Sequence, residues 1–393
     1  MKTEWKKVRL GEICSKIGSG ATPSGGSRVY IENGISFIRS QNVYNLNFDY
    51  EGLTHITDEA AKKLNGVTIE KDDVLLNITG DSVARTCIVP KNVLPARVNQ
   101  HVSIIRPKEK TILPKFLNYY LASPYMQSVM LGLAVGKGAS RNAITKTMIE
   151  NFEVPYPPLE TQKKIAGILS AYDDLIENNR KQIKLLEEAA QKLYKEWFVK
   201  LNFPGHENVK IVDGVPEGWK KEKLENWCRV FTGKKNANQN VENGIYPFFT
   251  CAPVPLLSND SLYEGKAVII SGNGSYTGRT QYYDGNFDLY QRTYACVRQK
   301  QEDYEYMPFI YYSMKILFEP IKMGGTKGSA IPYIVMADIT NTEFLYQYDI
   351  CKKFSVFAES VLDKIQILQN QIRLIQFARD RLLPRFMNGE LEV

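Results

Sequence analysis

The feature that most constrains this chain is that its second half repeats the first half in the same order. Five matched pairs carry the repeat: Trp5-Lys6-Lys7 with Trp219-Lys220-Lys221, Asn33-Gly34-Ile35 with Asn243-Gly244-Ile245, Arg85-Thr86 with Arg279-Thr280, Phe116-Leu117-Asn118-Tyr119-Tyr120 with Phe309-Ile310-Tyr311-Tyr312, and Lys137-Gly138 with Lys327-Gly328. The offset falls from 214 at the first pair to 190 at the last. Two units of this length predict two domains that each fold alone, with fewer loop residues in the second.

Length and composition allow two such units. The 393 residues exceed the roughly 100–200 residues of a typical domain, and 44% hydrophobic with 24% charged residues suits folded domains. The formal net charge of +7 is compatible with a polyanionic partner. The pI of about 8.8 stays below the value of about 9 at which basicity alone indicates nucleic acid.

Each unit ends in a stretch whose apolar residues alternate in steps of four and three. The first row is Ile165, Leu169, Tyr172, Ile176, Asn179, Ile183, Leu186, Ala190, Leu193 and Trp197. The second row is Phe354, Ala358, Val361, Ile365, Leu368, Ile372, Ile375, Arg379, Leu382 and Phe386. An average step of 3.5 residues is typical of a coiled-coil seam, and about 40 helical residues extend roughly 60 Å.

A narrow apolar seam needs a partner, and the simplest partner for each helix is the other helix. An approximate two-fold axis between the units would make the helices antiparallel. The alternative is that each helix packs on its own domain or on another protein. Asn179 in the first row either fixes the register of the seam or is solvated, and Pro384 is expected to kink or end the second helix.

The segments before the helices predict mixed structure. Short β-rich runs lie at 74–78, 102–105, 267–270 and 294–297, and helices are expected near 114–130 and 307–318. We therefore predict an α+β (mixed α/β) fold with two globular domains joined by two long antiparallel coiled-coil helices in a pseudo-two-fold arrangement. The predicted boundaries are 1–158 and 204–348 for the domains, and 159–203 and 349–393 for the helices.

Polar glycine-rich loops at 18–26, 136–142, 271–280 and 324–329 recur in both copies. Glycine allows close backbone approach, Lys and Arg bind phosphates, and Arg, Asn and Gln pair with base edges. Any one loop taken alone is better explained as an ordinary surface turn, but the recurrence of such loops in both copies favours DNA contact. The candidate DNA-binding residues are Arg39, Gln41, Asn42, Arg85, Lys137, Arg141 and Asn142 in the first domain, and Asn273, Tyr276, Arg279, Gln291, Arg292 and Lys327 in the second.

The sequence offers no motif set for catalysis. The three histidines, His55, His101 and His206, lack spaced partners typical of a metal site, so structural or surface roles are expected. Residues 20–27 resemble a phosphate-binding loop but carry Gly26 where the essential lysine belongs. Dinucleotide-binding and nucleophile-elbow motifs are also missing. We therefore expect neither a catalytic residue nor a metal site.

Location and redox state follow from two further patterns. The first ten residues are polar, and the most apolar stretch, near 129–135, is shorter than the roughly 18–20 residues of a membrane span. A cytoplasmic protein is therefore expected. The six cysteines are scattered without a CxxC pair, so reduced, buried thiols are expected.

Two stretches resemble a known family, the specificity subunits of type I restriction-modification systems. Residues 5–11 look like the opening of a target-recognition domain, and Pro157-Pro158-Leu159-Glu160-Thr161-Gln162-Lys163-Lys164-Ile165-Ala166 resembles the joint between such a domain and a conserved helix. The resemblance covers the whole chain. In the second copy, residues 347–354 keep only the Lys-Lys-apolar portion of the joint.

The resemblance implies a division of labour. Each domain would read one half of a bipartite double-stranded DNA target, and the helices would set the spacer. Helices and nearby surfaces would recruit two adenine-methylating modification subunits, and restriction subunits that translocate and cut. Those partners would bind S-adenosylmethionine, ATP and magnesium, so the chain itself would hold no cofactor and catalyse nothing. The alternatives are a stand-alone methyltransferase or nuclease, and a non-catalytic adaptor whose helices bind partner helices.

Overall fold

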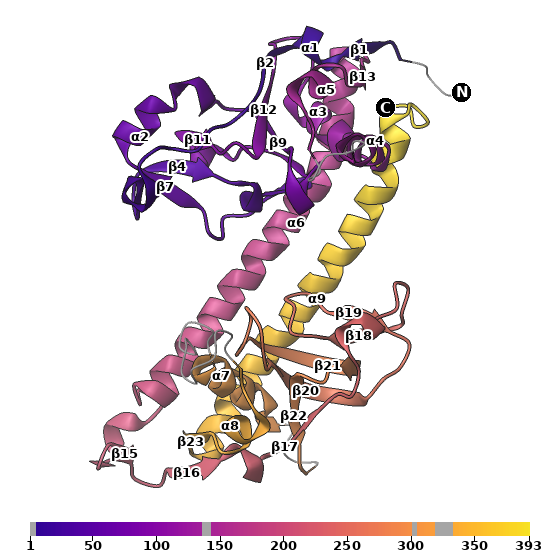
Figure 1. The fold of residues 1–393 in the computed structure, drawn as a ribbon. Coiled ribbons are helices and arrows are strands. Elements are labelled where there is room, and N and C mark those ends of the chain that lie inside the picture. Colours follow the sequence, from indigo (N-terminus) through magenta and orange to yellow (C-terminus); the bar gives the residue numbers. More distant parts are fainter. Residues whose placement is uncertain (1–4, 136–142, 301–304, 319–332) are drawn as a thin grey trace. The chain divides into compact units, whose positions relative to one another are not determined.

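The computed structural model describes residues 5–135, 143–300, 305–318 and 333–393 (Figure 1). The chain forms two compact units, one of residues 1–179 with 371–393 and one of residues 180–370. Each unit therefore contains one globular domain, part of the first long helix and the opposite part of the second.

The first unit contains two small sheets. The antiparallel four-stranded sheet has the order β10 (Thr86–Ile88), β9 (Val74–Asn77), β12 (Val102–Pro107) and β2 (Cys14–Ser19). The five-stranded sheet has the order β3 (Tyr30–Ile31), β7 (Thr54–Ile56), β4 (Ile35–Ile38), β11 (Ala96–Val98) and β8 (Thr68–Ile69), with β4 and β11 parallel. Strands β1 (Lys7–Arg9) and β13 (Glu153–Pro155) pair separately, so the ends of the domain meet beside the start of the first long helix.

The single helix expected near 114–130 is two helices, α3 (Pro114–Ala122) and α4 (Pro124–Ala134). Ser123 separates them with extended backbone, because the residue before a proline disfavours helical geometry. Its hydroxyl accepts a hydrogen bond from the Met126 amide at 3.4 Å and caps α4. The break turns the chain so that both helices contribute buried side chains to the core beside the four-stranded sheet.

The second unit has one six-stranded sheet. Its order is β17 (Cys228–Thr232), β22 (Thr293–Arg298), β20 (Tyr263–Ser271), β21 (Thr280–Leu289), β18 (Tyr246–Phe249) and β19 (Leu256–Ser258). Strands β16 (Lys220–Lys223) and β23 (Glu343–Tyr346) pair like β1 and β13. Helices α7 (Met307–Leu317) and α8 (Met336–Thr340) complete the domain.

The number of sheets differs because one strand of the second unit, β21, corresponds to two strands of the first unit, β10 and β11. In the first unit, β10 and β11 are separated by a segment that contains Pro90 and Pro95, which cannot donate ladder hydrogen bonds. In the second unit, the ten residues of β21 run without proline from β20 to the parallel partner β18.

Two long helices follow the predicted seam. Helix α6 (Leu159–Tyr194) continues through a π turn, Lys195–Val199, and α9 covers Tyr348–Met387. The described seam residues are buried or half-buried in the unit to which each belongs. Pro384 does not end α9, which continues to Met387; a proline this close to the end costs little of the remaining hydrogen-bond ladder.

The polar seam residues have partners. In the first unit, Asn179 is 7% exposed and its amide nitrogen donates to Gln371 Oε1 at 3.3 Å. Arg379 Nη1 donates to Asp173 Oδ1 at 2.6 Å. Because residue numbers rise on α6 from 173 to 179 while they fall on α9 from 379 to 371, the helices of this unit are antiparallel, as predicted.

Aromatic packing joins the helix pair of the second unit to its domain. Tyr194 and Phe198 of the first long helix lie 5.6 and 5.5 Å, between ring centroids, from Phe354 of α9. Tyr194 also shares a 2.8 Å hydrogen bond with Ser313 of α7. Full burial of Phe309 in the same cluster fixes α7 against both long helices.

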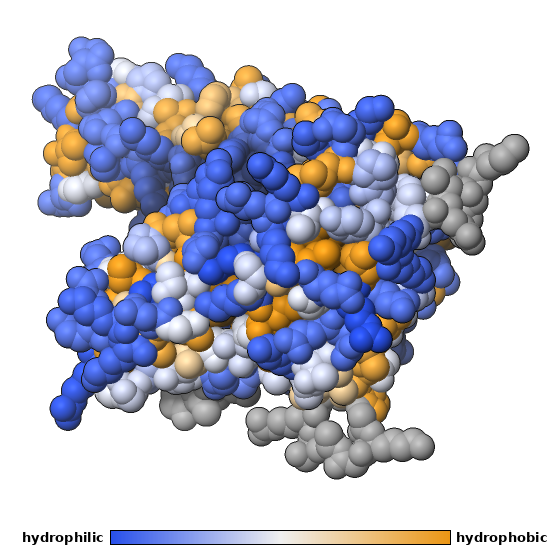
Figure 2. Space-filling view, turned by 90° about the horizontal axis from the view of Figure 1, so that it is seen from above, coloured by the Kyte–Doolittle hydropathy of each residue, from blue (hydrophilic) through white to orange (hydrophobic). Residues whose placement is uncertain are grey.

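Hydrophilic and hydrophobic side chains are interspersed on the face shown in Figure 2. Every helix among the described residues is too short or too polar to cross a bilayer.

All six cysteines are free; five are buried as expected, whereas Cys251 is only half-buried.

Candidate nucleic-acid interface

One turn, here named the arginine turn, has the same backbone in both units. It comprises residues 78–85 between β9 and β10, and residues 272–279 between β20 and β21. The first turn is closed by the bonds Ala84 N to Asn77 O (2.9 Å), Asn77 N to Arg85 O (2.8 Å) and Arg85 N to Ser82 O (3.2 Å). The second is closed by Gly278 N to Ser271 O (2.9 Å), Ser271 N to Arg279 O (2.9 Å) and Arg279 N to Tyr276 O (3.0 Å). Arg85 and Arg279 thus occupy the same point of one backbone frame.

A second turn, the glutamine turn, lies beside the first in each unit. It comprises residues 99–101 between β11 and β12, and residues 290–292 between β21 and β22. The bonds of the first unit are Val102 N to Asn99 O (3.2 Å) and Ile78 N to His101 O (2.9 Å). The bonds of the second unit are Thr293 N to Tyr290 O (3.0 Å) and Gly272 N to Arg292 O (2.8 Å). The second bond of each pair joins the glutamine turn to the arginine turn.

A glycine stands behind each glutamine turn. A Cβ atom on Gly20 would lie 2.0 Å from the Val98 carbonyl oxygen, and one on Gly233 would lie 1.7 Å from that of Leu289. Only glycine allows this approach, so the preceding loop supports the turn directly. The rigid backing suits a surface that must present side chains in a fixed geometry.

The first-unit candidates divide into exposed and structural residues. Arg39 Nη2 and the exposed Gln41 Nε2 both donate to the Gly52 carbonyl, at 2.9 and 3.1 Å. Asn42 is fully buried, and its amide donates to the carbonyls of Asp49 and Glu51 at 2.9 and 3.2 Å. In this structure Asn42 therefore holds the loop together and offers no edge to a base.

Arg85 is half-buried, and its guanidinium lies 4.4 Å from the ring centroid of Tyr44. Stacking on the ring orients the guanidinium plane while leaving N–H groups available for phosphate or guanine.

The second-unit candidates gather around the two turns. Gln291 and Arg292 are exposed in the glutamine turn, and Gln291 Nε2 donates to Asn236 Oδ1 at 2.7 Å. Tyr276 is 43% exposed in the arginine turn. Asn273 Oδ1 accepts a hydrogen bond from the Cys251 thiol at 3.0 Å, so the half-buried cysteine borders the candidate surface. Four candidates, Lys137, Arg141, Asn142 and Lys327, lie outside the described residues.

Neighbouring lysines in the loop behind the second glutamine turn have different environments. Lys234 is exposed. The ammonium of Lys235 instead binds Ser258 Oγ (2.8 Å), Asp260 Oδ2 (2.7 Å) and Asp288 Oδ2 (2.6 Å). Lys235 therefore ties the loop to the ends of β19 and β21.

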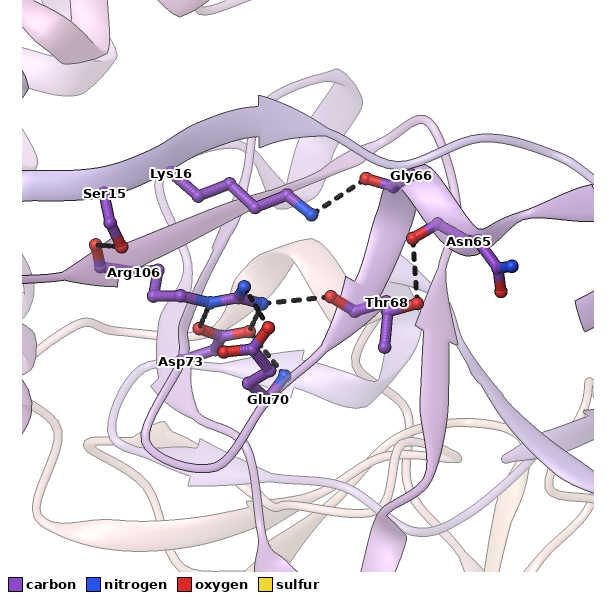
Figure 3. Close-up of polar contacts among 8 residues, drawn as sticks. All are labelled: Ser15, Lys16, Asn65, Gly66, Thr68, Glu70, Asp73 and Arg106. Atoms are coloured by element: carbon purple, nitrogen blue, oxygen red, sulfur yellow. Dashed lines mark hydrogen bonds and ion pairs between the residues drawn. The ribbon is translucent and has the colours of Figure 1, made fainter. Parts of the chain in front are cut away.

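Basic residues of the first domain are also used internally (Figure 3). Arg106 Nε and Nη2 bind both carboxylate oxygens of the buried Asp73, at 2.8 and 2.9 Å, and Nη1 pairs with Glu70. The hydrogen bond to Asp73 raises the pKa of Arg106 above its usual value, although burial acts against it. Lys16 Nζ donates to the Gly66 carbonyl at 2.8 Å. These cations stabilise the packing of the two sheets and are not free for DNA.

Sequence reasoning overlooked residues of the first glutamine turn. Gln100 is exposed; its Oε1 accepts a hydrogen bond from the Thr22 hydroxyl, and its Nε2 lies 3.1 Å from His101 Nε2. His101 Nδ1 lies 2.6 Å from Thr79 Oγ1. The missing signal was structural, because Gln100 matches Gln291 only once the two backbone frames are aligned.

Within the described parts of the chain, acidic, histidine and cysteine side chains form no group of three suited to a metal ion.

Comparison with known proteins shows which family this chain resembles. The model of the type I restriction modification DNA specificity domain matches residues 2–188. A type I restriction enzyme specificity subunit, MjaIX, from Methanocaldococcus jannaschii is 26% identical over 428 residues, covering 100% of this chain and 97% of that protein. The chain is therefore similar along its whole length to a specificity subunit of a type I restriction-modification system.

Other specificity subunits agree with this assignment. The EcoDI subunit of Escherichia coli is 32% identical over 45% of this chain and 39% of its own length. The crystal structure of a type I restriction-modification S subunit from M. genitalium has the same fold, with a TM-score of 0.60 and 16% identity over 98% of this chain and 96% of that one.

Proposed function

We propose that each unit of this specificity subunit reads one half of a two-part DNA sequence. The observation that carries the proposal is the repeated pair of turns. Their backbone bonds match and they share one arginine and one glutamine, while most of their other side chains differ. A common frame with different side chains suits two readers that bind DNA in the same way and prefer different bases. Covalent duplication here replaces the dimerisation by which many DNA-binding proteins address two half-sites.

In the same proposal, the long helices set the spacer between the half-sites and dock two modification subunits. Restriction subunits then join the complex, which works in the cytoplasm. S-adenosylmethionine, ATP and magnesium are assigned to those partners, and this chain contributes specificity without catalysis. The support is that α6 and α9 each contribute residues to both units.

A domain exchange tests the reading function. Residues 204–348 are replaced by the matching domain of another specificity subunit, and the methylated sequence is determined by methylome sequencing. One half of the sequence should change and the other half should stay. A change in both halves, or in neither, would contradict the proposal.

A matched insertion tests the spacer function. Seven residues are inserted into each helix, after Asn179 in α6 and after Asn370 in α9, which preserves the heptad. Each insertion adds about 10.5 Å of helix, or about three base pairs at 3.4 Å each. The spacer should lengthen by about three base pairs. An unchanged spacer would remove the helices from this role.

Two biochemical measurements address the alternative functions. The purified chain alone should neither methylate nor cut DNA, whereas activity would establish an enzyme. The assembled complex should bind DNA with log affinity falling linearly against log salt, because phosphate contacts release counterions. Binding that is independent of salt would instead favour a protein adaptor.

A further inference from the structure

We propose that Gln100 is a base-reading residue of the first unit, equivalent to Gln291 of the second, and that it recognises adenine in the major groove. This assignment rests on the proposed reading function and names the chemistry of its site.

The first step is positional equivalence. Gln100 and Gln291 are each the middle residue of a glutamine turn. Each turn follows a strand that pairs parallel, β11 with β4 and β21 with β18. Each is backed by a glycine and bonded to the arginine turn of its own unit. The two amides therefore emerge from the same point of the same frame.

The second step is that both amides are held from the same side of the frame. Thr22, two residues after Gly20, donates its hydroxyl to Gln100 Oε1. Asn236, three residues after Gly233, accepts from Gln291 Nε2 at 2.7 Å. Different residues thus perform one task, which is to orient a glutamine amide from the loop behind the turn.

The third step concerns the hydrogen bonds that Gln100 keeps available. Thr22 occupies one lone pair of Oε1, and His101 Nε2 accepts one N–H of Nε2 when the imidazole proton is on Nδ1, facing Thr79. Within the described residues, one lone pair and one N–H of the exposed amide remain. Adenine presents N6–H and N7 side by side, and glutamine binds this pair through one acceptor and one donor.

His101 acts here as a positioning residue. Its Nδ1 is fixed by Thr79 of the arginine turn at 2.6 Å, so its Nε2 holds the Gln100 amide at 3.1 Å. This contact links the two turns through side chains as well as backbone. An oriented amide loses less conformational entropy when it binds a base.

The test uses the full chain assembled with its modification subunits, acting on a library of random DNA duplexes. Sequencing the methylated duplexes yields the two-part motif for wild type and for Gln100→Ala, Gln100→Glu and Gln291→Ala. Gln299→Ala is the matched control. Gln299 is also exposed, but it follows the last residue of β22, whereas Gln291 precedes the first.

Gln100→Ala should lower discrimination at one adenine of one half-site by roughly 5- to 150-fold, the range for one bidentate base contact. Gln291→Ala should do the same in the other half. Gln100→Glu should shift preference at the same position toward cytosine, since a carboxylate only accepts. His101→Ala should weaken the same base pair, and combining it with Gln100→Ala should add little.

Several results would overturn the assignment. The assignment fails if Gln100→Ala leaves both half-site preferences unchanged, or if it lowers methylation evenly across sequences, as loss of a phosphate contact would. A wild-type complex that methylates without any two-part motif would refute the proposed function together with this inference. A clear wild-type motif that is insensitive to Gln100 refutes only the inference.

Discussion

Replacing Asp173 by alanine should destabilise the first unit by removing the anchor of its helix pair. Asp173 Oδ1 accepts from Arg379 Nη1 at 2.6 Å, and Oδ2 accepts from the Tyr119 hydroxyl of α3. The side chains of Arg379 and Asp173 are only 12% and 26% exposed. Burial by itself lowers the pKa of Arg379, but the carboxylates of Asp173 and Asp380 outweigh it and raise the pKa above its usual value. Because arginine is not deprotonated in proteins, the guanidinium also stays charged in the variant that lacks Asp173.

The magnitude follows from what is lost and what remains. Removing one partner of a fully buried pair costs about 3–5 kcal/mol. Here Asp380 still binds Nε and Nη2 of Arg379, at 2.9 and 2.8 Å, so part of the charge stays compensated. We expect a loss of about 2 kcal/mol for alanine and about 1 kcal/mol for asparagine, which keeps an acceptor. For a unit of about 200 residues, 2 kcal/mol corresponds to about 4–8 °C in Tm.

The assay is thermal and urea unfolding of the full chain, followed by circular dichroism. Asp174→Ala is the control, because Asp174 is exposed on the same helix and should change stability by less than about 0.5 kcal/mol. In an Arg379→Met background, Asp173→Ala should cost measurably less. If Asp173→Ala and Asp174→Ala unfold alike, the ion pair does not stabilise the helix pair.

Three further predictions concern the candidate interface. Gly233→Ala should destabilise the second unit strongly, because the new Cβ would meet the Leu289 carbonyl. Gly132→Ala, which adds a Cβ in open space on α4, should instead stabilise the first unit by about 0.5–1 kcal/mol. Unfolding titrations of the two variants test the contrast. Lys235→Met should lower stability by about 3 kcal/mol, because it leaves the buried Asp288 carboxylate without its cation. Lys234→Ala should leave stability unchanged and reduce the slope of log DNA affinity against log salt by about 1. Equal effects of the two variants would contradict the different roles of the two lysines. Cys251 should react first with iodoacetamide at pH 8, since Cys228 is buried and burial raises the pKa of the Cys14, Cys87, Cys296 and Cys351 thiols to about 12. Specific DNA should protect Cys251, and mass spectrometry of labelled peptides reports both effects.

Features carried by local pattern were predictable from the sequence. The 4-3 alternation identified seam positions that are buried or half-buried, from Ile165 to Phe386, because helical periodicity depends on residues three and four apart. Short apolar runs such as 102–105 became buried strands, because a short run rich in apolar, β-branched residues is also a local signal. The resemblance of residues 157–166 to one family's joint pointed to the family that the comparisons support.

Features that depend on distant contacts were not predictable. Asn42 resembled a base-contact residue by type, yet its amide is consumed by carbonyls seven and nine residues away. Gln100 was overlooked because its partner Thr22 lies 78 residues earlier. That β21 is one continuous strand could be predicted only from its pairing with β18 at its C-terminal end. Hydrogen-bond competition of this kind is decided by tertiary packing, which no local window contains.

The matched turns also explain how one fold can accommodate two different readers. Their closing bonds join backbone atoms, and backbone bonds do not constrain the side chains that project from the turn. Glycine is needed behind the turn, at Gly20 and Gly233, and within the arginine turn at Gly80 and Gly274, which share a positive φ. The positions that face outward are therefore free to differ, as His101 and Arg292 do at equivalent points of the frame. Exchanging these two residues should alter base preference in each unit while the backbone bonds of the turns stay in place. In the first unit the exchange also removes the contact of His101 with Thr79, which should cost about 1 kcal/mol of stability.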